Sequence, residues 1–114
     1  MENEVMQIIV YAGNARSLAM QSIRASKQGE FSEADRLMAE AEKNLKEAHH
    51  THAKILSVAS DEQQQIDLTL FMVHGEDHLM SAVTTIDLAK EFTAVHGELK
   101  ELRECVRLMK EEKV

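Results

Sequence analysis

The sequence contains no proline and no tryptophan, and only four glycines, three phenylalanines and one tyrosine. β-Sandwiches and barrels need many turn residues and strands rich in β-branched or aromatic residues, so this composition argues against both folds. The dominant residues are instead Ala, Leu, Met, Glu, Lys and Gln, all of which are strong helix formers. A length of 114 residues suits one domain with one modest core. We therefore expect a single all-α domain spanning residues 1–114.

Cysteine, basic residues and long apolar runs are also scarce, and each scarcity excludes some classes of function. The only cysteine, Cys105, cannot form an intrachain disulfide, which favours a reducing compartment. Thirteen Lys and Arg against twenty Asp and Glu give a net charge of −7, which disfavours nonspecific binding to nucleic acid. The longest apolar run, Leu70–Val73, is far shorter than the ~20 residues that span a bilayer, and the acidic start lacks the basic residues of a signal peptide. We expect a cytoplasmic protein with no nucleic-acid partner and no direct membrane insertion.

Apolar residues recur at spacings of three and four, which predicts amphipathic helices. The expected ranges are about 3–28, 32–58 and 61–96, followed by a helical tail over 98–113. Because short connections between long helices favour antiparallel neighbours, we expect an up-down-up three-helix bundle.

Four residues are expected to mark where these helices begin and end. Gly29 suits the left-handed position that follows a helix. Ser32 and Ser60 each open a segment that resembles a capping box, and so are expected to start the second and third helices. Gly97 is a candidate bend or interruption before the tail.

The third predicted helix has two apolar faces rather than one. The first face comprises Leu68, Phe71, Met72, Leu79, Ala82, Val83 and Ile86, and the second comprises Ile66, Leu70, Val73, Met80 and Leu88. Two partner helices readily cover one face, and so short a chain has little left to cover the other. We expect another copy of the same helix to do so in a homo-oligomer. A monomer with one wide apolar face remains the alternative.

Three side chains near the middle of this helix are candidates for chemistry. Asp77 falls within the second apolar face, where a carboxylate is costly to bury unless it is protonated, paired or bound to a metal. His74 and His78 lie one turn apart on the polar flank beside it. They could bind zinc, form a hydrogen-bonded pair at an interface, or include a nucleophilic imidazole that accepts a transferable group. Spacing alone leaves these three interpretations open.

The segment Val73–Met80 resembles the active-site signature of the lactose/cellobiose-type enzyme IIA proteins. These proteins belong to the bacterial phosphoenolpyruvate-dependent sugar phosphotransferase system. The segments Ile8–Ser17, Gly29–Phe31 and Glu47–His49, together with the alanines of the second helix, resemble the same family. The resemblance covers about residues 5–96.

This resemblance implies a phosphotransferase component that forms a phosphohistidine. His74 matches the family's phosphorylated histidine, which accepts a phosphoryl group from the phosphocarrier protein HPr. The group then passes to a cysteine of the IIB component and on to a sugar carried by the membrane component IIC. The sugars of the family are β-linked disaccharides such as cellobiose, lactose and chitobiose. The alternative is a non-catalytic regulatory or scaffold oligomer of the same fold.

The resemblance also implies a homotrimer with a metal ion at its axis. Asp77 matches the family's carboxylate near that axis, where a divalent ion such as Mg²⁺ can relieve repulsion between three converging carboxylates. His78 matches a second signature histidine, which we expect beside the phosphoryl group as an auxiliary residue.

Overall fold

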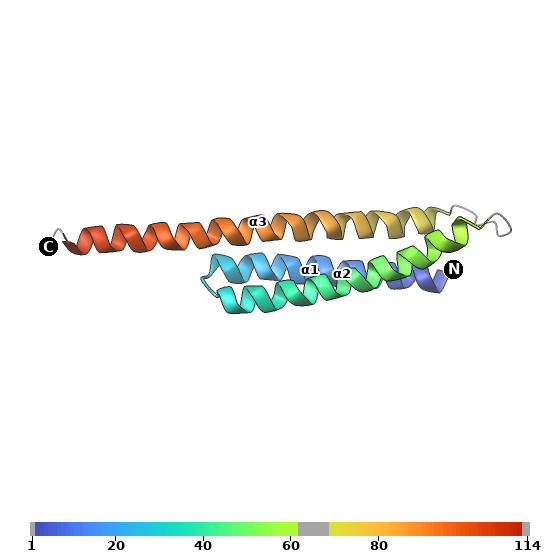
Figure 1. Cartoon of the computed structure of the whole chain (residues 1–114), viewed down its shortest axis with the longest axis horizontal. Helices are drawn as coiled ribbons and strands as arrows, with labels where there is room; N and C mark the ends of the chain where they lie inside the picture. The colour runs from blue at the N-terminus through green and yellow to red at the C-terminus, as the bar shows by residue number, and fades with distance from the viewer. Residues whose placement is uncertain (1, 62–68, 113–114) are drawn as a thin grey trace.

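Three helices make up the computed structural model, which describes residues 2–61 and 69–112. They are α1 (Glu2–Lys27), α2 (Phe31–Ala59) and α3 (Leu70–Glu112). Figure 1 shows α1 and α2 as an antiparallel pair, with α3 running beside them and continuing well past the turn that joins them. This arrangement confirms the predicted all-α, up-down-up bundle. No helix within the described ranges is long and apolar enough to cross a membrane.

The connection between α1 and α2 is a turn built around Gly29. Its φ of +83° lies in the left-handed region that glycine adopts without strain, as the sequence predicts. The Gly29 N–H donates to the Ser26 carbonyl (3.0 Å) and the Glu30 N–H donates to the Ala25 carbonyl (2.9 Å). These two bonds satisfy the last carbonyls of α1 in a Schellman motif.

The predicted role of Ser32 as the N-cap of the second helix is wrong. The helix begins at Phe31, and Glu30 occupies the cap position without a side-chain hydrogen bond to the helix. The Ala34 N–H already donates to the Glu30 carbonyl (2.9 Å), so the helical bonding pattern starts two residues before Ser32. The Schellman turn leaves no room for a longer connection.

The predicted capping box at Ser60 is also wrong, because Ser60 is the C-cap of α2. Its N–H and its Oγ both donate to the Leu56 carbonyl, at 3.0 and 2.9 Å. Asp61 and Thr69 lie outside the helices, so the third helix does not begin at residue 61. Thr69 caps it instead, since its Oγ1 accepts a hydrogen bond from the Met72 N–H at 3.2 Å. Residues 62–68, which include Ile66 and Leu68 of the predicted apolar faces, lie outside the described residues.

Gly97 does not interrupt α3, contrary to expectation. The helix continues through it to Glu112 and absorbs the predicted tail. A glycine inside a helix costs only about 1 kcal/mol relative to alanine, and its helix-forming neighbours in the segment 98–104 outweigh that cost.

Small side chains allow the three helices to pack closely. Seven alanines with no exposed surface line the main core: Ala12, Ala15 and Ala19 of α1, Ala41 and Ala48 of α2, and Ala82 and Ala89 of α3. Leu79 and Ile86 of α3 are buried among them, and Phe71 and Met72 pack against this core. The first predicted face of the third helix is therefore confirmed for Phe71, Met72, Leu79, Ala82 and Ile86.

The second predicted face of α3 is uncovered within the single chain. Leu70 is 86% exposed, and Val73, Met80 and Leu88 are each about half exposed. Large apolar side chains arranged in this way are characteristic of a surface that another molecule covers. Two separate faces, rather than one wide face, are thus present on this helix.

Candidate functional site

His74 and His78 lie together on α3 and contact each other directly. Their Nε2 atoms are 3.2 Å apart, and their rings meet edge to face with centroids 4.5 Å apart. For this contact to be a hydrogen bond, one Nε2 carries a proton and the other presents its lone pair. His74 is exposed and His78 is half-buried, so a substrate group can reach His74. One-turn spacing therefore delivers an accessible imidazole with a second imidazole beside it.

Gly75, which directly follows His74, lies where α3 packs against α1. Gly75 is buried, and a Cβ atom built on it would lie 3.0 Å from Cγ1 of Val5. Val5 is itself in the core with 2% of its surface exposed. The missing side chain at position 75 therefore lets the two helices approach closely next to His74, and this contact fixes the position of the histidine on the bundle.

A second polar contact joins α2 to this part of α3. His52 Nε2 lies within hydrogen-bonding distance of Glu76 Oε1, and the His52 side chain is only 17% exposed. The sequence did not predict this contact between the second and third helices. A signal was present, since His52 lies in register with the apolar stripe of its helix, where Ala48 and Ile55 are buried. The exposed neighbours His49 and His50 form no polar side-chain contact with another described residue.

Asp77 lies where the sequence places it, between Val73 and Met80 on the uncovered face of α3, and its side chain is exposed. It lines a shallow, mostly apolar groove of about 630 Å³ together with Leu70, Phe71, Val73 and His74. His74, the candidate nucleophile, and Asp77 therefore line the same groove.

The described residues of one chain do not form a metal site around Asp77. Within the part of the chain that the structure describes, no three His, Cys, Asp or Glu side chains gather as metal ligands. The same fact disfavours zinc held by His74 and His78, because such a site needs at least three protein ligands. An exposed carboxylate on an apolar surface fits a metal only where other copies of the chain bring further oxygen ligands to it.

Comparison with known proteins identifies the family. The model of the lactose/cellobiose-specific IIA subunit of the phosphotransferase system matches residues 3–97. The cellobiose-specific EIIA component of Lactococcus lactis is 42% identical over 98 residues, which cover 86% of this chain and 84% of that protein.

Solved structures agree with this assignment. The cellobiose-specific enzyme IIA of Bacillus anthracis superposes with a TM-score of 0.82 at 33% identity, covering 87% of this chain and 90% of that one. The chitobiose IIA protein of the Escherichia coli phosphotransferase system, solved in complex with HPr, gives a TM-score of 0.76 at 33% identity. There the coverage is 87% of this chain and 95% of the other. This chain belongs to the lactose/cellobiose-specific IIA subunits and is a phosphotransfer component of the phosphotransferase system.

Proposed function

We propose that this chain carries a phosphoryl group on His74 between HPr and the cysteine of a IIB component. The observation that carries the proposal is the accessible His74 imidazole with the His78 imidazole 3.2 Å from its Nε2. Family membership supplies the direction of transfer, and the solved complex of a relative with HPr supports the same donor here.

In the proposed reaction, the Nε2 lone pair of His74 attacks phosphorus while the bond to the donor breaks. The new P–N bond is reactive enough for the group to pass onward to a thiolate. His74 then regains its lone pair as the P–N bond breaks. The protein's main contribution is to position the group in line and to offset the charge on the phosphoryl oxygens.

His78 has two roles in this proposal. Its Nε2–H donates to Nε2 of His74, which selects the tautomer of His74 that has a lone pair at Nε2 and a proton at Nδ1. When the phosphoryl group arrives, the same N–H turns to a phosphoryl oxygen. No described residue accepts a hydrogen bond from Nδ1 of His74.

We further propose that the uncovered face of α3 is buried in a homotrimer. Leu70, Val73 and Met80 on this face are at least 47% exposed, which leaves an apolar surface for two other copies to cover. Light scattering should then give three times the chain mass of 12.9 kDa. A stable monomer at micromolar concentration would contradict this part of the proposal.

In the proposed trimer, the Asp77 carboxylates of the three copies would hold a divalent cation, with Mg²⁺ the best match to oxygen ligands. The cation would neutralise three carboxylates in an apolar environment. We also place the protein in the cytoplasm and assign its pathway to a β-linked disaccharide, on the basis of the cellobiose and chitobiose relatives. The sugar itself would be bound by IIC.

Reconstitution of the phosphoryl relay tests the main proposal. Phosphoenolpyruvate, enzyme I, HPr and a cognate IIB protein are combined with and without this chain. We expect label on IIB only when the chain is present and none with the His74→Ala variant. Unchanged labelling of IIB by His74→Ala would favour the alternative of a non-catalytic regulatory or scaffold oligomer, which keeps the fold without carrying phosphate.

A further inference from the structure

A pocket of about 400 Å³ lies where the turn between α1 and α2 meets the C-terminal part of α3. Lys27 and Phe31 line it on the side of the turn, and His96, Lys100 and Arg103 line it on the side of α3. Figure 1 shows α3 passing this turn and continuing beyond it, so one continuous helix supplies that side. The pocket therefore joins three helices at the end of the bundle where α1 and α2 are connected.

This pocket is separate from the candidate phosphorylation site. At a rise of about 1.5 Å per residue, His96 lies about 33 Å along α3 from His74. The family match ends at residue 97, so family membership assigns no role to Lys100 or Arg103. What the pocket can bind therefore has to be inferred from its own side chains.

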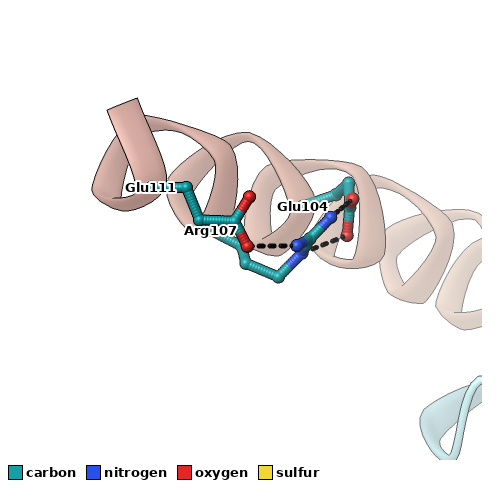
Figure 2. A network of polar contacts seen from close by, with 3 residues as sticks. All are labelled: Glu104, Arg107 and Glu111. Atoms are coloured by element: carbon teal, nitrogen blue, oxygen red, sulfur yellow. Dashed lines mark hydrogen bonds and ion pairs between the residues drawn. The ribbon is translucent and has the colours of Figure 1, made fainter. Parts of the chain in front are cut away.

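The carboxylate of Glu104, which also lines the pocket, is paired with an arginine of its own helix. Arg107 donates through Nε to Glu104 (3.2 Å) and through Nη1 to Glu111 (2.6 Å), as Figure 2 shows. The hydrogen bonds from Arg107 hold the pKa of Glu104 below its ordinary value, so this carboxylate is charged at neutral pH. Because Glu104 and Arg107 offset each other, the remaining side chains determine the net charge of the pocket.

Three other cations line the pocket without a counter-ion. Lys27, Lys100 and Arg103 form no ion pair with another described residue. Lys100 is nevertheless held in place, because its Nζ lies over the ring of Phe31 at 5.1 Å from the centroid. Cations gathered in this way repel one another, and an anion among them relieves that repulsion. The pocket is thus positive on a chain whose net charge is −7.

A buried serine fixes the ring of His96 at this pocket. Ser26 is 2% exposed, and its Oγ lies 2.8 Å from the Ile23 carbonyl oxygen and 2.7 Å from His96 Nδ1. Because the single hydroxyl proton is donated to Ile23, Ser26 accepts a hydrogen bond from the Nδ1–H of His96. Nε2 of a neutral His96 therefore carries no proton. It becomes a donor when the ring is protonated, which a bound anion favours.

We propose that this pocket binds a small organic phosphate, a phosphate monoester about the size of a hexose. Lys27, Lys100 and Arg103 would donate charge-assisted hydrogen bonds to the phosphoryl oxygens. Phe31 and Leu99 add an apolar surface for the carbon skeleton. The volume lies in the range of pockets that enclose small ligands. This binding is independent of the phosphoryl transfer proposed above.

Calorimetric titration of the full-length protein with three probes tests the class of ligand. Glucose 6-phosphate should bind at one molecule per chain, and glucose should not bind. Inorganic phosphate should bind about tenfold more weakly than glucose 6-phosphate, because it has no carbon skeleton to contact Phe31 and Leu99. Absence of glucose 6-phosphate binding, or equal binding of glucose, would overturn the proposal. Equal binding of inorganic phosphate would overturn the assignment to an organic phosphate.

Removal of single charges locates the site. Arg103→Gln and Lys100→Gln should each weaken binding of glucose 6-phosphate about tenfold, because each removes one charged donor. Arg24→Gln is the matched control, since it removes the same charge from an exposed arginine of α1 that does not line the pocket. Equal losses in all three variants would indicate nonspecific attraction to positive charge and would overturn the site. All three variants retain His74, so their phosphorylation by HPr tests the proposed function separately.

Proton uptake tests the contribution of His96. In the empty pocket the three unpaired cations oppose protonation of His96, while Glu104 and Arg107 offset each other. A bound dianion reverses that balance, so binding of glucose 6-phosphate at about pH 7.5 should take up protons in the wild type and none in His96→Gln. Titration in buffers of different ionisation enthalpy measures this uptake. Wild-type binding without proton uptake would contradict a contact between His96 and the phosphate.

Discussion

Gly75 of α3 packs directly on Val5 of α1, with only 3.0 Å between the position of a Cβ on the glycine and Cγ1 of the valine. The contact lies next to His74 in sequence and joins the first and last helices where the candidate site is formed. A helix interior normally disfavours glycine, so its presence here reflects the space available rather than helix propensity. The glycine in the signature segment therefore has a packing role.

Two glycine-to-alanine variants should have opposite effects on stability. Gly97→Ala meets no atom within 4 Å and should stabilise the protein by up to about 1 kcal/mol through helix propensity. Gly75→Ala gains the same propensity but crowds a buried valine, and overpacking typically costs about 1–3 kcal/mol. We expect a net loss at position 75, measured by urea unfolding. Equal stabilisation at both positions would show that α1 moves aside easily.

Replacement of His78 should slow phosphorylation without unfolding the protein. His78→Ala removes the ring that contacts Nε2 of His74, and we expect the rate of phosphoryl uptake to fall about 10- to 100-fold. His78→Gln retains an N–H donor and should recover part of that rate. Rapid-quench labelling at saturating HPr separates this effect from weaker binding of HPr. An unchanged rate in His78→Ala would mean that His78 takes no part in phosphoryl transfer.

Asp77→Leu should preserve the assembly and abolish its response to metal removal. A well-packed leucine often stabilises a buried interface more than a carboxylate does, so the variant should be as stable as the wild type or more so. A chelator should modestly lower the thermal midpoint of the wild type, because release of a bound ion removes its stabilisation. Dissociation of the variant, with no chelator effect on the wild type, would instead mean that Asp77 forms a hydrogen bond between copies.

An ion pair between α3 and α2 should stabilise the fold slightly, and this stabilisation should disappear at high pH. Lys90 Nζ lies 2.6 Å from Glu42 Oε1, and the hydrogen bond to this carboxylate raises the pKa of Lys90. Because the pKa is higher in the folded than in the unfolded chain, the stabilisation is complete below the unfolded value and is lost as pH rises through the folded one.

Lys90→Gln should therefore cost about 0.5 kcal/mol or less at neutral pH, since both side chains are about half exposed. The stability difference from the wild type should shrink as the pH rises above about 10.4, the ordinary pKa of lysine. Lys46→Gln, at an exposed lysine of α2 that forms no ion pair with another described residue, is the control in the same urea titrations. A difference that persists at high pH would indicate that the lysine stem, rather than its charge, stabilises the fold.

Periodicity predicted the helices well because burial of apolar side chains dominates their formation. Helix ends were harder to predict, since the free backbone N–H groups at a helix start could have been capped by the side chain of more than one residue. Ser32 and Ser60 match the capping pattern, yet the Schellman turn at Gly29 and the cap at Thr69 determine the actual boundaries. Local composition does not distinguish between such competing caps.

The candidate site was likewise predictable where it depends on one helix, and not where it depends on the packing of two. His74, Asp77 and His78 lie on consecutive turns of one helix, so their mutual placement follows directly from their spacing. The contact between His52 and Glu76 joins two helices, and it depends on the axial position of α2 relative to α3. That register is a property of the packed core and was not visible in the sequence.

The central claim, that His74 itself carries the phosphoryl group, is tested most directly by mapping the modified residue. The chain is incubated with phosphoenolpyruvate, enzyme I and HPr, and its intact mass and its peptides are measured under alkaline conditions that preserve phosphohistidine. We predict one acid-labile phosphoryl group per chain on His74, no labelling of His74→Ala, and normal labelling of His50→Ala, whose histidine is exposed on α2. Full labelling of His74→Ala, with its helix content unchanged, would contradict the account.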